Sequence, residues 1–76
     1  MKELVTTLVR GLVRQPERVQ VYKEDEDGQT YYDVEVEPSD RGRVIGREGR
    51  TVNALRTLLG AVARKRGESC ELEIID

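Results

Sequence analysis

The residues best suited to chemistry in this chain are the glycines and arginines of the segment Gly46-Arg47-Glu48-Gly49-Arg50. Glycine lacks a Cβ atom, so a loop with two glycines can turn tightly and let a sugar–phosphate chain come close. Gly49 precedes a predicted helix, and the free amide groups of a helix N-terminus favour an anion. Arg47 and Arg50 add positive charge beside those amides. The segment therefore predicts a phosphate-binding loop between two helices.

The G-x-x-G pattern by itself carries little information. With seven glycines among 76 residues, chance gives about 0.6 matches per chain. Its surroundings make this match informative, because Val44 and Ile45 precede it, Val52 follows it, and helical patterns lie on both sides. The segment also lacks the G-x-x-x-x-G-K-[ST] spacing, which excludes a nucleotide-binding P-loop.

The remaining side chains offer little for catalysis or metal binding. The chain has no histidine and a single cysteine, Cys70, so the commonest acid–base residue and most of the usual metal ligands are missing. No serine or cysteine stands beside a plausible base, and Glu17, Glu24 and Asp33 are predicted surface acids without convergence. We therefore expect no enzyme, no catalytic residue, no cofactor and no metal site. Cys70 is interpreted as a small core residue of a strand, and a lone cysteine suits a reducing, cytoplasmic setting.

The charge is distributed unevenly along the chain. The net charge is −2, but residues 40–66 contain eight basic and two acidic residues, a local charge of +6 that leaves −8 for the remainder. A polyanion responds to such a local patch, because charges farther away than about 8–10 Å are screened. The basic residues are Arg41, Arg43, Arg47, Arg50, Arg56, Arg64, Lys65 and Arg66. The alternative stays open that four of them are ordinary solvated helix charges: Arg41, Arg43, Arg56 and Arg64.

The first half of the chain is predicted to form a helix and a β-hairpin. Residues 2–14 carry leucines and valines at helical spacing, and Gln15-Pro16 ends the pattern, since the residue before proline avoids the α region. Two stretches of alternating apolar and polar residues follow, at 19–22 and 32–37. Asp27-Gly28 between them favours a hairpin turn, because glycine accepts positive φ.

The second half is predicted to form two helices and a last strand. Pro38-Ser39-Asp40 signals the start of a short helix that ends near Ile45. The long helix after the glycines ends before Gly67, and residues 70–75 alternate as a strand. Its apolar stripe is Val52, Leu55, Leu58, Leu59 and Val62. The expected fold is α+β in the order α-β-β-α-α-β, with helices on one face of a three-stranded sheet that can be mixed.

Motif, order and length together resemble a known family. The stretch VIGREGRTV, residues 44–52, is similar to the V-I-G-x-x-G-x-x-[IV] signature of K-homology (KH) RNA-binding domains. The order of elements matches the bacterial, type II arrangement of these domains. The resemblance covers residues 1–76 as a single KH domain and looks close to the small bacterial single-KH proteins of the KhpA (YlqC) type.

The resemblance implies a mode of RNA binding. KH domains clamp the backbone of about four single-stranded nucleotides with the glycine loop and place the bases on an apolar groove. The implied RNA-binding residues are Arg43, Val44, Ile45, Gly46, Arg47, Glu48, Gly49, Arg50, Val52, Lys65 and Arg66. The loop and its arginines would hold phosphates, and Lys65 and Arg66 would close the far side of the groove. The apolar members would line the groove, or belong mainly to the core: Val44, Ile45 and Val52.

Three features bear on how well such a site would bind. Glu48 places an acid in the loop, which should weaken binding unless it pairs with Arg47 or Arg50. The short loop at 67–69 leaves little room for side chains that read bases. The outward residues of the predicted sheet are acidic and would repel phosphate: Asp33, Glu35, Glu71 and Glu73. Tyr22 and Tyr31 could stack on bases, but because they occupy alternate strand positions they are interpreted as surface packing.

Two functions follow as expectations. The first is non-enzymatic binding of single-stranded RNA with modest affinity and weak sequence specificity, as an RNA chaperone or post-transcriptional regulator. The alternative is a protein–protein interaction module, because the resemblance implies pairing as a homodimer or with a larger KH protein of the KhpB (Jag) type. No apolar run approaches the ~20 residues that cross a bilayer, so we expect no membrane partner and a cytoplasmic protein.

Overall fold

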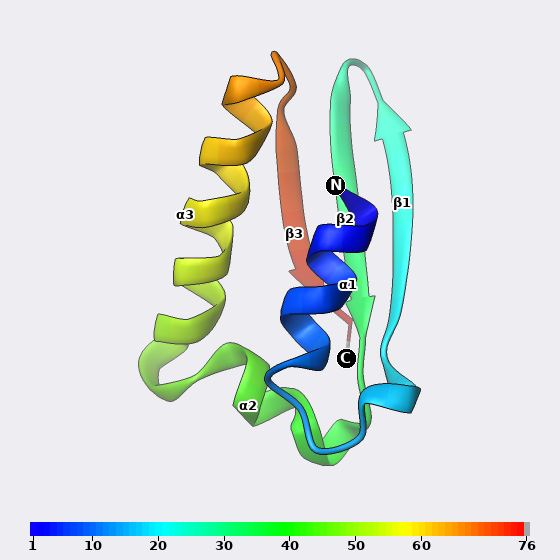
Figure 1. Cartoon of the computed structure of the whole chain (residues 1–76), viewed down its shortest axis with the longest axis vertical. Coiled ribbons are helices and arrows are strands. Elements are labelled where there is room, and N and C mark those ends of the chain that lie inside the picture. The colour runs from blue at the N-terminus through cyan, green and yellow to red at the C-terminus, as the bar shows by residue number, and fades with distance from the viewer. Residues whose placement is uncertain (76) are drawn as a thin grey trace.

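The computed structural model describes residues 1–75 and has the expected α+β order of elements. The helices are α1 (Lys2–Arg10), α2 (Arg41–Ile45) and α3 (Arg50–Lys65), and the strands are β1 (Gln20–Glu26), β2 (Gln29–Glu35) and β3 (Cys70–Ile74). Short 3-10 turns lie at Pro16–Arg18, Pro38–Asp40 and Arg47–Gly49. Figure 1 shows α1 lying against the sheet and α3 running beside β3, with α2 at one end of the molecule.

The three strands form one mixed sheet with β2 in the middle. β1 is antiparallel to β2, and β3 is parallel to β2. The hairpin between β1 and β2 turns at Asp27 and Gly28, whose φ values of 50° and 80° are both positive, as a two-residue type I′ turn requires. α2 and α3 carry the chain back between β2 and β3, which is why the last strand is parallel. The expected mixed sheet is confirmed.

The first helix is shorter than its apolar pattern predicts. α1 ends at Arg10, where the pattern indicated a helix through residue 14. Gly11 follows, and glycine is a poor helix former. The backbone amides of Arg14 and Gln15, which would continue a helix, instead donate to the carboxylate of Asp40 at 3.2 and 3.0 Å. A contact with a distant part of the chain therefore replaces the last turn of the predicted helix.

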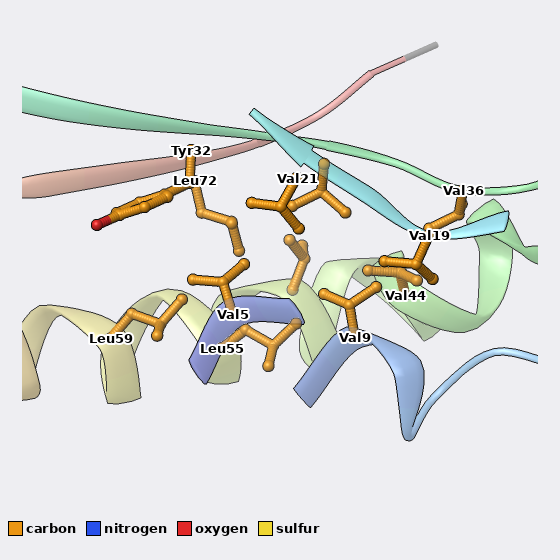
Figure 2. Packing of buried hydrophobic residues seen from close by; sticks show 12 residues of the cluster. Val5, Val9, Val19, Val21, Tyr32, Val36, Val44, Leu55, Leu59 and Leu72 are labelled. Carbon is orange, nitrogen blue, oxygen red and sulfur yellow. The ribbon is translucent and has the colours of Figure 1, made fainter. Parts of the chain in front are cut away.

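The core lies between the sheet and the helices and consists mainly of valine and leucine (Figure 2). The helices contribute Val5, Val9, Val44, Val52, Leu55 and Leu59, and the strands and their ends contribute Val19, Val21, Tyr32, Val34, Val36 and Leu72. α3 also buries Ala63, whereas Leu58 from the predicted stripe is 47% exposed. Cys70 lies in β3 and packs partly against the core, as predicted, and burial raises the pKa of its thiol.

The opposite face of the sheet is acidic, in agreement with the sequence. Pairing between the strands places Tyr22, Asp33 and Glu73 in one row across the sheet and Glu24, Tyr31 and Glu71 in the next. Strand alternation turns these rows away from the helices, because the intervening residues Tyr32, Val34 and Leu72 are buried in the core. This face therefore repels phosphate, whereas the basic residues around α2 and α3 attract it.

Candidate nucleic-acid interface

α2 delivers the chain to the glycine loop. A helix of five residues is too short to be stable by itself, so its position depends on contacts with the rest of the protein. Val44 is fully buried and anchors one face of α2 in the core. The helix ends at Gly46, whose amide donates to the carbonyl of Gly42 at 2.9 Å.

The Gly46–Gly49 loop requires glycine at its first position. Gly46 has φ 78° and ψ 169°, a conformation that is essentially restricted to glycine. A Cβ atom at Gly46 would lie 2.7 Å from the backbone nitrogen of Thr51, closer than real Cβ contacts come. Glu48 and Gly49 also have positive φ, at 56° and 75°. These conformations let α3 begin directly after α2, with bare backbone at the turn.

The loop ends at the N-terminus of α3. Gly49 is the N-cap residue, and glycine has no side chain that could cap the first amide groups of the helix. The N-terminal end of such a helix carries about half a positive charge. Backbone amides and this partial charge together favour a phosphate at the loop, whatever base the nucleotide carries.

Three arginines surround the loop in different environments. Arg47 is exposed on the loop itself. Arg50 lies 3.7 Å from Glu48 between side chains that are 78% and 74% exposed, so Glu48 pairs with one of its two expected partners. Such an exposed pair is weak and can open for a phosphate. Arg43 approaches the buried carboxylate of Asp40, with 3.8 Å between its Nε and Oδ1.

The three apolar residues near the loop differ in burial. Val44 is 0% exposed and Val52 is 6% exposed, whereas Ile45 is 38% exposed. No base can lie on a fully buried side chain, so the structure favours the alternative that Val44 belongs to the core, and Val52 offers little surface. Both side chains belong to the hydrophobic core, and α2 packs against α3. Ile45 is the member of this group that a base can reach.

Lys65 and Arg66 lie at the opposite end of α3 from the loop (Figure 1). Sixteen residues at about 1.5 Å each separate the two ends by about 24 Å. Both side chains are exposed. They can contact nucleotides held by the loop only if the strand follows α3 along its length, and their role in RNA binding stays a prediction.

Arg56 has a structural task. Its Nε donates to the carbonyl of Leu72 in β3 at 3.1 Å, and its Nη1 donates to Oδ1 of Asn53 at 3.3 Å. The bond to Leu72 ties α3 to the edge of the sheet, whereas the bond to Asn53 lies within α3. For Arg56, the interpretation as an ordinary helix residue is therefore preferred to one as a phosphate ligand.

Two residues at the site were not identified from the sequence. Thr51 faces Gly46 and leaves no room for a side chain there unless the backbone shifts. Asp40 was interpreted as a helix cap, but within the described chain its carboxylate makes no capping bond to α2. It binds the backbone 25 and 26 residues earlier instead. The Pro-Ser-Asp motif correctly indicated the start of a helix, but no local pattern indicates which backbone amides an aspartate will reach.

The described residues show neither a metal site nor a membrane span. In residues 1–75, no three histidine, cysteine, aspartate or glutamate side chains are grouped so that they could hold a metal ion. Over the same residues, no helix has the length and apolar composition needed to cross a bilayer.

Comparison with known proteins agrees with this geometry. A family model described as "KhpA/KhpB, KH domain" matches residues 2–74. The chain belongs to this KH-domain family. The α-β-β-α-α-β order and mixed sheet are accordingly a type II KH fold, and the family is one of RNA-binding proteins rather than enzymes.

Curated relatives in several bacteria are similar over nearly the whole chain. "RNA-binding protein KhpA" of Thermotoga maritima is 43% identical over 97% of this chain and 95% of its own length. The protein of the same name in Listeria monocytogenes is 42% identical over the full length of both chains. The one in Chlamydia pneumoniae is 37% identical over all of this chain and 97% of its own.

Proposed function

We propose that this chain binds single-stranded RNA without catalysing a reaction, and that the Gly46–Gly49 loop clamps the backbone of about four nucleotides. The observation that carries this proposal is the loop conformation. Bare backbone at Gly46 and Gly49 adjoins the N-terminus of a 16-residue helix, with exposed arginines on either side. The names of the relatives as RNA-binding proteins support the ligand class.

The same geometry supports modest affinity and weak sequence preference. Backbone amides and arginines recognise phosphates, which are the same in every nucleotide. Glu48 competes with RNA for Arg50, and Ile45 supplies the exposed apolar surface near the loop. We further propose that residues 1–76 act as one KH domain in the cytoplasm, as an RNA chaperone or post-transcriptional regulator.

A titration of labelled, mixed-sequence single-stranded RNA tests the clamp. The double variant Arg47→Asp/Glu48→Asp places two acids in the loop, and aspartate tolerates the positive φ of residue 48. Lys2→Glu, at an exposed position at the start of α1, makes the same change of −2 in net charge away from the loop. We expect the double variant to lose binding and Lys2→Glu to keep it, with thermal unfolding to verify that each protein is folded.

Salt dependence provides a second readout. If three to five phosphates are engaged, log Kd against log salt should have a slope of about 2 to 3.5, from about 0.7 per single-strand contact. Equal binding by the double variant and the wild type would place the RNA surface elsewhere. Absence of binding by the wild type at low salt and high micromolar protein would contradict RNA binding altogether.

A second candidate function is association with another protein through α3. Leu58 is 47% exposed, and its helical neighbours Ala54 and Ala61 are exposed on the same side. We propose this face for pairing with a second copy or with a larger KH protein of the KhpB type. Analytical ultracentrifugation of wild type and Leu58→Glu tests the homodimer: association in the wild type alone supports it, and a monomer at high concentration counts against it.

A further inference from the structure

Asp40 is the one charged side chain that the structure buries within residues 1–75, with 2% exposed. A carboxylate away from water is unfavourable unless it is paired and hydrogen-bonded. Both of its oxygens are used: Oδ1 accepts from the amide of Arg14 at 3.2 Å, and Oδ2 accepts from the amide of Gln15 at 3.0 Å. The guanidinium of Arg43 lies 3.8 Å from Oδ1. The burial is therefore compensated by three specific partners.

The hydrogen-bond partners of the Asp40 carboxylate are unusual for a residue at the start of a helix. Aspartate at the start of a helix ordinarily accepts a hydrogen bond from the first turn of its own helix. In the described structure Asp40 makes no such bond to α2 and turns to the segment between α1 and the turn Pro16–Arg18. Asp40 thus connects the start of α2 to Arg14 and Gln15, which are far from the glycine loop in the sequence.

The contacts of Asp40 affect the position of the loop because α2 is little more than one turn long. Asp40 and Val44 hold two points one turn apart, and Gly46 follows two residues after the second point. A displacement of α2 at Asp40 is transmitted to Gly46 with little intervening backbone to absorb it. Arg43 lies on the same turn, with Nε, the inner nitrogen of its guanidinium, 3.8 Å from Oδ1 of Asp40.

We propose that Asp40 is a positioning residue of the RNA site: its buried carboxylate sets where α2 places the Gly46–Gly49 loop and keeps Arg43 beside it. Asp40 touches no RNA and acts through α2. The inference rests on the proposed function of the loop as the phosphate clamp.

The test compares Asp40→Asn with a core variant that is destabilised without touching α2. Asparagine keeps the size of the side chain but presents an N–H₂ group to one of the two backbone amides, so one hydrogen bond is lost. Val5→Ala, at a buried position of α1 near the middle of the core, is the control (Figure 2). RNA affinity and the amide resonances of Gly46 and Gly49 are measured at a temperature at which circular dichroism shows each protein folded.

We expect Asp40→Asn to shift both glycine resonances and to weaken RNA binding about fivefold. An effect of this size corresponds to the loss of roughly one hydrogen bond that positions α2. Val5→Ala should lower the melting temperature but leave the resonances and the affinity as in the wild type. If Asp40→Asn also leaves both readouts unchanged, Asp40 is only a stabilising residue and the proposal is overturned. If the wild type binds no RNA, the proposed function fails separately, and the glycine resonances decide whether Asp40 positions the loop.

A second measurement uses the wild type in case Asp40→Asn does not fold. Coupling between two sites is reciprocal, so RNA bound at the loop must strengthen the contacts of Asp40 if those contacts position the loop. Hydrogen exchange of the Arg14 and Gln15 amides should therefore slow at least about threefold on saturation with RNA. Unchanged exchange at both amides would overturn the proposal.

Discussion

The two ends of α3 contain the same kinds of residue and differ in what they can do. Glycines and arginines stand at both: Gly46, Arg47, Gly49 and Arg50 before the helix, and Arg64, Lys65, Arg66 and Gly67 at its end. At the first end the helix presents amides and positive potential, which attract an anion. At the second end it presents carbonyls and negative potential, which the cations of the last turn offset. Composition alone therefore does not show which end of α3 favours an anion.

The glycines at the two ends also differ sterically. Gly67 ends the helix with φ 71°, its amide donating to the carbonyl of Arg64 at 3.0 Å, and among the described residues no atom lies within 4 Å of a Cβ placed there. At Gly46 the same atom would meet the backbone of Thr51. One glycine is needed only for its backbone angle, the other also for space. A close approach of backbone, rather than glycine content, therefore distinguishes the Gly46–Gly49 loop from the turn at Gly67.

The largest expected effect separates these two glycines. Gly46→Ala should lower the free energy of unfolding by about 2–5 kcal/mol, from a left-handed backbone and an added methyl against Thr51. Gly67→Ala should cost about 1–2 kcal/mol, from the backbone alone. RNA affinity should fall more than about tenfold for the first variant and stay unchanged for the second. Urea unfolding and RNA titration check both, and equal costs would show that Thr51 does not limit Gly46.

The arginines at the two ends can be separated in the same way. Arg47→Gln should weaken RNA binding about tenfold and flatten the salt slope by about 0.7, with little change in stability. Lys65→Gln/Arg66→Gln should lower stability by about 1 kcal/mol, through the helix dipole, and leave RNA binding unchanged. A loss of RNA affinity in the second variant would instead support the sequence-based expectation that Lys65 and Arg66 contact RNA along α3.

A smaller effect is expected at Glu48, because its carboxylate competes with an RNA phosphate for Arg50. Glu48→Gln frees Arg50 from the 3.7 Å contact and should raise RNA affinity about two- to threefold, since exposed pairs contribute about 0.2–1 kcal/mol. Glu17→Gln makes the same change in net charge at an exposed position outside the loop. Fluorescence anisotropy should show a gain for the first variant that the second lacks; equal gains would indicate a general charge effect.

The smallest expected effect concerns pH at the C-terminal end of α3. The Cys70 thiol donates to the carbonyl of Leu59 at 3.8 Å, and its pKa is raised from about 9 by burial and then by Glu68 and Glu71. The unfolded chain therefore loses this proton at a lower pH than the folded protein does. The contribution of this thiol to the free energy of unfolding is therefore fully present below about pH 9 and is lost as the pH rises above it.

Urea unfolding between pH 7 and 10 measures this dependence. Cys70→Ser should reduce the decline in stability above pH 9, whereas the decline should persist in Lys65→Gln/Arg66→Gln, which retains the thiol. An identical pH profile for Cys70→Ser and wild type would show that the thiol is not responsible.

Much of the fold and part of the site could be predicted from the sequence. The hairpin, the start of α2 at Pro-Ser-Asp, the glycine loop and the acidic outer face depend on neighbours a few residues apart, and all appear as expected. The end of α1 was predicted wrongly, because the amides of Arg14 and Gln15 donate to the carboxylate of Asp40 and do not continue the helix. Leu58 shows the same limit: its spacing fits the apolar stripe of α3, but the packing of α3 on the sheet leaves it outside.

The order of elements, the place of the glycine loop and the sign of the charge around it follow from the sequence, because propensity, periodicity and charge are properties of residues and their near neighbours. Which of the residues around the loop face solvent depends on how the helices pack in three dimensions. This packing buries Val44, leaves Ile45 exposed and engages Arg56 with the sheet. It also joins Asp40 to amides 25 and 26 residues away. Such contacts form only when the packed core has fixed the distance between segments, and no local pattern encodes that distance.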